Sequence, residues 1–191
     1  MSTVHERIDP RLRAFIERQH VFFVATAPTD PAGHVNVSPK GVGGTLAVID
    51  DSTVAYLDIT ASGAETIAHL RDNGRITLMF CAFEGPPNVV RLHGHGRFVT
   101  VYDDGFADLL TLFDEHRGAR GVVIVDVERV SDSCGYGVPL LTHVGERDLL
   151  PEYMDRKGEA GQVEYRRRKN TVSIDGLPAF DYDGPVPADA G

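Results

Sequence analysis

The stretch "DITASGAETIAHLRDNGRITLMF", residues 58–80, decides how the chain is organised. It follows an apolar, strand-like run at 54–57 and soon enters five small residues, 60–64. The apolar spacing after them predicts a helix over 62–72. The continuous apolar run that comes next, 75–83, is typical of a strand buried on both faces. The stretch therefore predicts a strand, a turn of small residues, a helix and another strand.

Two interpretations of the small residues stay open. In the first, Ser62 and Glu65 form an S-x-x-E capping box, in which Ser62 accepts from the Glu65 amide and the Glu65 carboxylate reaches back to the Ser62 amide. In the second, a phosphate sits on the free amides of the helix N-terminus, and the hydroxyls of Thr60 and Ser62 add donors. Small side chains leave those amides accessible. The charge of Glu65 opposes a phosphate unless the cap holds it back.

Outward from this stretch, the chain has the pattern of short strands joined by turns, with few helices between them. We expect strands at 21–27, 34–41, 45–49, 53–57, 75–83, 89–101 and 121–130, and helices at 9–19, 62–72 and 103–116. The first helix begins with Asp9 as its cap and Pro10 in its first turn. Strand–turn–strand spacing favours an antiparallel barrel over a doubly wound parallel sheet. We therefore expect a mainly β protein with flanking helices.

The composition argues against several classes of function. A formal net charge of −9 opposes a nucleic-acid-binding surface over the whole protein. No apolar run approaches the length needed to cross a bilayer, and the first residues carry charges without an apolar signal region. The two cysteines, Cys81 and Cys134, do not make a disulfide framework. We expect a cytoplasmic protein that binds neither nucleic acid nor membrane.

The domain organisation follows from a change of texture near residue 131. Strand-like segments give way to "SDSCGYGVPLL", then to a charged segment and to "NTVSIDGLPAF". We expect a barrel domain at 1–130 and an extension at 131–180 that packs on the barrel or on a dimer partner. The last residues, 181–191, are expected to form a disordered tail.

The order of the motifs resembles the pyridoxamine 5′-phosphate oxidase-like family. "VNVSPKG", "YLDITASGAETIAHL", "NGRITLMFCAF" and "VVRLHGHGRFV" follow one another as in that family, and "SCGYGVP" and "YRRRKN" resemble a branch whose substrates are mostly unassigned. The resemblance implies an antiparallel split β-barrel that binds FMN. It also implies a homodimer in which FMN lies between the two subunits.

The same resemblance implies a set of cofactor-binding residues. In the family, the FMN phosphate meets the second barrel strand and the strand-to-helix turn, and a later strand faces the flavin. The matching positions here are Ser38, Lys40, Thr60, Ser62, Gly63 and Arg91. This chain has Ser62-Gly63-Ala64 where the oxidases carry Ser-Arg-Lys, and it lacks their final Arg-x-His segment. Both departures argue against pyridoxamine phosphate as the substrate.

The resemblance implies an FMN-dependent oxidoreductase with a small-molecule substrate. Because a flavin carries the redox chemistry itself, such a protein needs no acid–base pair for the redox step, and no catalytic residue is predicted. Two alternatives stay open. One is an F420-dependent reductase on the same barrel, and the other is a flavin- or haem-binding protein without turnover.

Other polar residues leave their roles open. His93 and His95 share one face of a strand, but no third ligand lies near them in the sequence, so no metal site is predicted. Cys134 is either a reactive thiol or simply exposed. Tyr136 either stacks on a ligand or belongs to a turn. The basic run 165–169 either covers a solvated face, pairs with the acidic segment before it, or reaches a phosphate on a neighbouring subunit.

Overall fold

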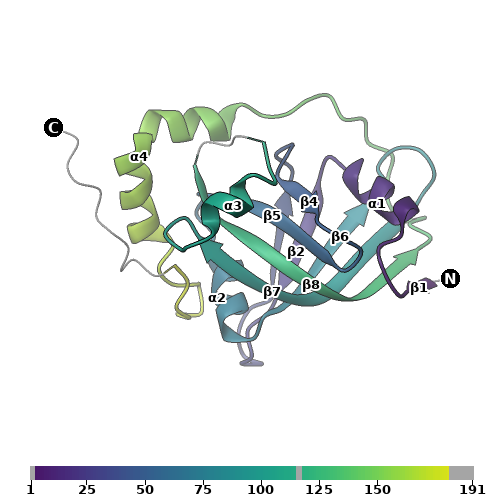
Figure 1. Cartoon of the computed structure of the whole chain (residues 1–191), viewed down its shortest axis with the longest axis horizontal. Helices are drawn as coiled ribbons and strands as arrows, with labels where there is room; N and C mark the ends of the chain where they lie inside the picture. Colours follow the sequence, from purple (N-terminus) through teal and green to yellow (C-terminus); the bar gives the residue numbers. More distant parts are fainter. Residues whose placement is uncertain (1–2, 115–117, 181–191) are drawn as a thin grey trace.

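The computed structural model describes residues 3–114 and 118–180, which form one antiparallel sheet with flanking helices (Figure 1). The strands are β1 (Thr3–His5), β2 (Phe22–Thr26), β3 (Asn36–Lys40), β4 (Leu46–Val48), β5 (Thr53–Ile59), β6 (Arg75–Cys81), β7 (Val89–Thr100) and β8 (Ala119–Ser133). The helices are α1 (Pro10–Glu17), α2 (Glu65–Asp72), α3 (Phe106–Leu110) and α4 (Leu149–Lys169).

The sheet curls into a half-barrel, which confirms the predicted mainly β fold with flanking helices. Its strand order is β3-β2-β6-β7-β8-β5-β4, and β1 pairs with β8. Every pairing is antiparallel. The two ends of this path, β3 and β4, leave the barrel split along one side. Within residues 3–114 and 118–180, no helix is both long and apolar enough to cross a membrane.

The core lies inside the curl and follows the alternation of the strands. In β2, Phe22 and Val24 are buried while the residues between them are half-buried. The strand β6 was predicted to be buried on both faces, and this is wrong: Ile76 and Leu78 are buried, but Thr77 is only half-buried. The reason is that β6 packs on the core with one face only, whereas β5 and β8 are buried on both faces.

The N-terminus of α1 and the C-terminus of α2 match the sequence prediction. Asp9 caps α1, and its Oδ1 accepts a hydrogen bond from the Leu12 amide at 2.7 Å. Asn73 follows α2 as a turn residue, as expected. Its side-chain amide donates to the Ala27 carbonyl at 2.9 Å, and its Oδ1 accepts from the Arg75 amide at 2.9 Å. The bonds from Leu12 to Asp9 and from Arg75 to Asn73 are local, and the sequence can reveal such bonds.

The helix expected at 103–116 is much shorter in the structure. Only Phe106–Leu110 is helical, and the next residues form i to i−3 bonds, from the Thr111 amide to Asp108 and from the Leu112 amide to Leu109. The Thr111 hydroxyl also donates to the Asp108 carbonyl at 2.5 Å, so it competes with a continued helix. Part of the prediction, 115–116, lies outside the described residues.

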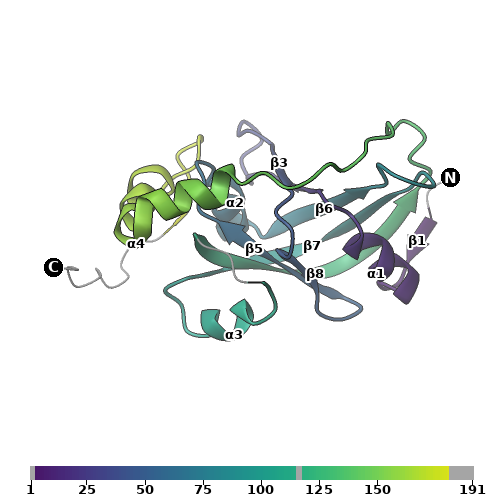
Figure 2. The same cartoon turned by 90° about the horizontal axis from the view of Figure 1, so that it is seen from above.

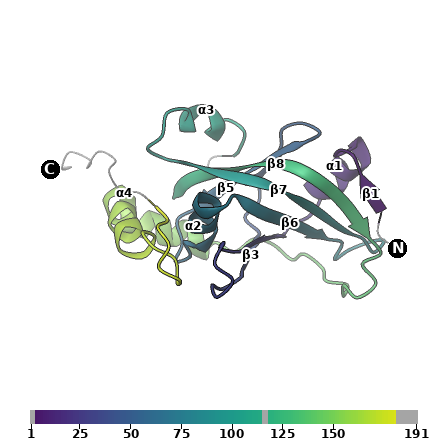
Figure 3. The same ribbon diagram turned by 90° about the horizontal axis from the view of Figure 1, so that it is seen from below.

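The C-terminal extension runs the length of the barrel before it folds back. Residues 134–148, here called the crossing segment, pass from the end of β8 to α4 at the opposite end of the molecule (Figure 2). Figure 3 shows α2 and α4 at one end of the sheet and α1 at the other. Ala179 and Phe180 then pack on Ile67 and Ala68 of α2. The predicted tail at 181–191 lies outside the described residues.

Candidate functional site

A buried carboxylate lies beneath the turn that the sequence singled out. Asp58 of β5 accepts from Lys40 Nζ of β3 at 2.9 Å and from Arg120 Nε of β8 at 2.6 Å. Only 3% of Asp58 is exposed. Burial, the largest single effect, raises the pKa of this carboxyl, but the charges and hydrogen bonds of Arg120 and Lys40 outweigh it and lower the pKa to about 2. Asp58 therefore stays ionised at neutral pH.

This ion pair also closes the split side of the barrel. The strand β3 pairs with β2, and β5 pairs with β4 and β8, so the described pairings place β3 and β5 in different parts of the strand path. The Lys40–Asp58 contact joins them through side chains. Arg120 then ties Asp58 to the turn, because its Nη2 donates to the Gly63 carbonyl at 2.8 Å and its Nη1 to the Ala61 carbonyl at 3.3 Å.

The C-terminal extension also holds this turn. The turn consists of Thr60–Ala64 and is called the 60–64 turn below. Thr60 is fully buried, and its hydroxyl accepts from Arg166 Nη1 of α4 at 3.4 Å. Asn170, just after α4, donates to the Ala61 carbonyl at 2.8 Å. Two carbonyls of the turn are thus drawn toward the protein, while Ala61, Ser62 and Gly63 are exposed.

The predicted capping box is wrong. The helix begins at Glu65, the N-cap is Ala64, and no side chain caps it. Glu65 is therefore the first helical residue instead of the third, so its carboxylate cannot pair with Ser62 as a capping box requires. Its Oε2 accepts from the Ala64 amide at 3.0 Å, and its Oε1 accepts from the Ile174 amide at 3.3 Å.

The exposed part of the turn presents free donors. Among the described residues, the amides of Ala61, Ser62 and Gly63 have no acceptor, and neither do those of Glu65 and Thr66 at the start of α2. Free amides at a helix N-terminus attract an anion. A short polyanionic group such as a phosphate monoester fits this donor set, because the side chains of the turn are small.

The remaining predicted residues, Ser38 and Arg91, lie on opposite faces of the sheet. Ser38 is opposite Val24 and therefore faces the core, as Lys40 does two residues later. Its hydroxyl is buried without a partner in the described structure. Arg91 is opposite Met79, in the row of residues that leads across Phe23 to Pro39, and so it faces outward.

Within one chain, the structure brings part of the predicted set together. Thr60, Ser62 and Gly63 belong to the 60–64 turn. Lys40 contacts Asp58, and Asp58 lies two residues before that turn in the sequence. Ser38 lies on the same strand face as Lys40. Arg91 is separate, and its Nη1 donates to Ser133 Oγ at 3.2 Å.

Sequence reasoning missed three buried charged residues that support the 60–64 turn: Asp58, Arg120 and Arg166. Asp58 and Arg120 are 62 positions apart, and Arg166 lies 106 positions from Thr60. A charged residue inside a strand-like apolar run was the signal available for Asp58. In the basic run 165–169, Arg166 is buried against the turn, while Arg168 and Lys169 are exposed as a solvated face would be.

The other polar residues have ordinary surroundings. His93 Nδ1 is 3.1 Å from Thr77 Oγ1, and His95 Nδ1 pairs with Glu128 at 2.9 Å. Burial, followed by the charges of Arg129 and Arg91, lowers the pKa of His93. Cys134 is exposed, and Tyr136 is 82% exposed. Neither makes a contact in the described structure that assigns it a role.

An antiparallel half-barrel with a strand-to-helix turn held by buried cations defines a split-barrel protein. The chain belongs to the pyridoxamine 5′-phosphate oxidase family, which matches residues 8–134. It is 39% identical over 198 residues to the pyridoxamine 5′-phosphate oxidase family protein ustO of Aspergillus flavus. That match covers 94% of this chain and 78% of the relative.

Solved structures show the same fold at lower identity. A single-residue variant of HupZ from Group A Streptococcus is 24% identical, with a TM-score of 0.51, and the match covers 66% of this chain and 99% of that one. A putative 5-nitroimidazole antibiotic resistance protein from Bacteroides thetaiotaomicron is 17% identical, with a TM-score of 0.50, and the match covers 69% of this chain and 86% of that one. These likenesses concern the fold alone.

Proposed function

We propose that the protein binds FMN without a covalent bond and works as a flavin-dependent oxidoreductase on a small molecule. The observation that carries the proposal is the 60–64 turn, which offers free amides at the surface and rests on buried cations. Membership of the pyridoxamine 5′-phosphate oxidase family supports a flavin as the ligand. The bound flavin would supply the hydride chemistry, and the protein would supply position and electrostatics.

The charges around the turn favour an anion. Lys40, Arg120 and Arg166 lie beneath or beside it, against the carboxylates of Asp58 and Glu65. The three cations outnumber the two anions. Lys40 is the cation with access to the outside, since its side chain is 23% exposed and that of Arg120 only 5%. Lys40 would therefore contact the phosphate, while Arg120 would hold the turn in shape.

Glu65 sets the limit on affinity in this proposal. Its carboxylate occupies the Ala64 amide, next to the free amides of Ser62 and Gly63. A phosphate on those amides would lie close to a negative charge, which weakens the interaction. The Ile174 amide holds the other carboxylate oxygen, so the extension would keep Glu65 on its present amide and away from the phosphate.

We further propose that the protein is a homodimer that pairs through the outward face of the sheet. On this face Val37 of the edge strand β3 is 62% exposed, and Val35, which lies just before β3, is 71% exposed. Arg91 lies on the same face of the sheet. Such a pairing would be isologous and would let Arg91 reach toward the partner's flavin.

Absorbance of the purified protein is the first test of cofactor class. Oxidised flavin gives two visible bands, F420 gives one band at shorter wavelength, and haem gives a Soret band. The expected result is a flavin spectrum, or its appearance when FMN is added to the stripped protein. A lone F420 or Soret band would contradict FMN as the cofactor.

Affinity for FMN and for riboflavin then tests the phosphate contact. FMN should bind at least about tenfold more tightly, since a charge-assisted contact is worth about 1.5–3 kcal/mol. Equal affinity would remove the 60–64 turn as the phosphate site. Oxidation of NADH or NADPH by the FMN-loaded protein separates an oxidoreductase from a carrier.

A further inference from the structure

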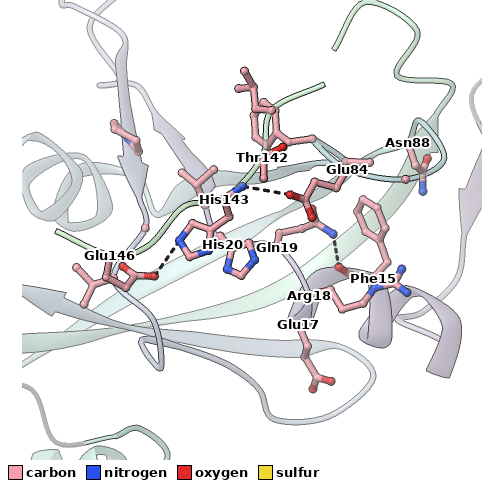
Figure 4. Close-up of a pocket in the computed structure, with 18 of the residues that line it drawn as sticks. Phe15, Glu17, Arg18, Gln19, His20, Glu84, Asn88, Thr142, His143 and Glu146 are labelled. Carbon is pink, nitrogen blue, oxygen red and sulfur yellow. Dashed lines mark hydrogen bonds and ion pairs between the residues drawn. The ribbon is translucent and has the colours of Figure 1, made fainter. Parts of the chain in front are cut away.

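A second candidate site lies in a large cavity away from the 60–64 turn. The cavity measures about 1420 Å³ and opens between α1, the turn after β6 and the crossing segment (Figure 4). His20, His143 and Glu146 line it and are called the His–Glu cluster below. Figure 4 shows the rings of His20 and His143 side by side, with the Glu146 carboxylate facing His143.

Two parts of the chain far apart in sequence place these side chains together. After α1, the Gln19 amide donates to the Ile16 carbonyl at 3.1 Å, and the Gln19 side chain donates to the Phe15 carbonyl at 2.7 Å. These bonds fix the residue before His20. On the crossing segment, the His143 amide donates to Glu84 Oε1 at 3.1 Å. The backbone on each side of the cluster is therefore anchored.

The ring nitrogens and the carboxylate oxygen of the His–Glu cluster lie near one another without being hydrogen-bonded. The two rings are stacked, with centroids 3.7 Å apart and planes at 17°. His143 Nε2 and Glu146 Oε1 are 3.6 Å apart, which is too long for a hydrogen bond. One possible ligand atom from each residue lies within 4.8 Å of the other two. Ligand atoms around a tetrahedral zinc ion are about 3.4 Å apart. Because a ring nitrogen donates its lone pair in the plane of the ring, the two exposed imidazoles have to turn out of their stack to bind one ion.

Two other surface histidines of this chain pair with a carboxylate, whereas His20 does not. His34 pairs with Asp175 at 2.6 Å and His95 with Glu128 at 2.9 Å, and each is an ordinary His–carboxylate pair. In the described structure, His20 has no hydrogen bond or ion pair. It instead stacks on a second histidine, with a carboxylate nearby. An ion between the three would engage the ring nitrogen of His20 that has no partner.

We propose that the His–Glu cluster binds one divalent transition metal ion of the zinc class. Two imidazoles and one carboxylate suit zinc, cobalt, nickel or copper, whereas magnesium and calcium prefer an all-oxygen shell. Three protein ligands leave a fourth position toward the cavity for water or for a small ligand that donates an oxygen or nitrogen atom. The ligands come from two walls of the cavity, His20 after α1 and His143 and Glu146 on the crossing segment. A bound ion would therefore tie the crossing segment to the end of α1.

Titration of the full-length protein with Zn²⁺ after chelator treatment tests this site. The expected result is one ion per chain, and Co²⁺ in its place should give the intense visible bands of a tetrahedral site. His20→Ala and His143→Ala should each weaken Zn²⁺ by about tenfold or more. Glu146→Gln, which keeps the side-chain shape, should also weaken it. His95→Ala is the matched control, because it removes an exposed histidine beside a carboxylate elsewhere, and it should leave Zn²⁺ binding unchanged.

Protection from proteolysis supplies a second measurement. Zn²⁺ should slow cleavage within the crossing segment of the wild type and of His95→Ala, but not of His20→Ala, whose substitution lies outside that segment. Equal Zn²⁺ affinity in the wild type and in a folded His20→Ala/His143→Ala variant would overturn the proposal. So would a wild type that binds no Zn²⁺ at tens of micromolar.

Discussion

Replacement of Asp58 by asparagine tests how the barrel is closed and what holds the 60–64 turn. Asp58→Asn leaves the Arg120 guanidinium buried beside a neutral amide, and breaking a buried ion pair by removal of one partner costs about 3–5 kcal/mol. Urea unfolding of the FMN-free protein at neutral pH should show this loss. Asp126→Asn is the control, because Asp126 is exposed on β8 and has no ion pair among the described residues.

The difference in the free energy of unfolding between the wild type and Asp58→Asn should also depend on pH, and this gives a sharper test. A carboxyl with an ordinary pKa of 3.8 and a folded pKa of about 2 adds about 2.4 kcal/mol to the free energy of unfolding at pH values well above both. This contribution is present above pH 3.8 and is lost as the pH falls through about 2. Between about pH 6 and pH 3, the wild type should therefore lose roughly 1 kcal/mol more than Asp58→Asn. Parallel pH profiles for the two proteins would refute the buried, ionised Asp58.

Four further substitutions, with one control, address the proposed cofactor site and dimer. Lys40→Ala should weaken FMN by about tenfold and riboflavin far less, because it removes the accessible cation, and flavin fluorescence quenching measures both. Glu65→Gln should bind FMN more tightly than the wild type, because it removes a negative charge beside the free amides. Gly63→Val should bind FMN less tightly, because a Cβ at Gly63 lies 3.2 Å from Glu65 Oε2 and crowds the free amides. Unchanged affinity in both variants would mean that the phosphate binds elsewhere. Val37→Lys should give a monomer by light scattering, whereas Ile49→Lys, which changes an exposed residue just beyond β4 at the other edge of the sheet, should not.

The sequence predicted those features that local patterns determine. Alternating apolar residues located most of the strands, and Asp9 and Asn73 signalled helix ends through bonds to residues only a few positions away or just across a turn. The capping box at Ser62 and Glu65 failed because tertiary contacts prevailed over the local pattern: Arg120 and Asn170 hold the carbonyls of the turn, and the helix starts later. Ser62→Ala should consequently cost no cap energy.

Residues that meet through the fold left little signal in the sequence. Asp58 and Arg120 come from strands that pair through a ladder whose register has to be known before the two charges can be matched. His20 and His143 meet because the crossing segment returns to the end of α1, and no periodicity records such a return. The short spacing of His93 and His95 on one strand is visible in the sequence, whereas the approach of His20 to His143 is not.

The anchoring of the 60–64 turn by Arg166 and Asn170 has a consequence for the order of events during synthesis. Thr60 leaves the ribosome 106 residues before its partner Arg166, an interval of roughly 5–20 s at ordinary elongation rates. During that time the strands β2 to β8 can pair, but the turn still lacks Arg166, which donates to the Thr60 hydroxyl, and Asn170, which donates to the Ala61 carbonyl. Cofactor capture would therefore begin only once residues 166–170 have emerged, so a nascent chain stalled before them should fold its barrel and remain colourless.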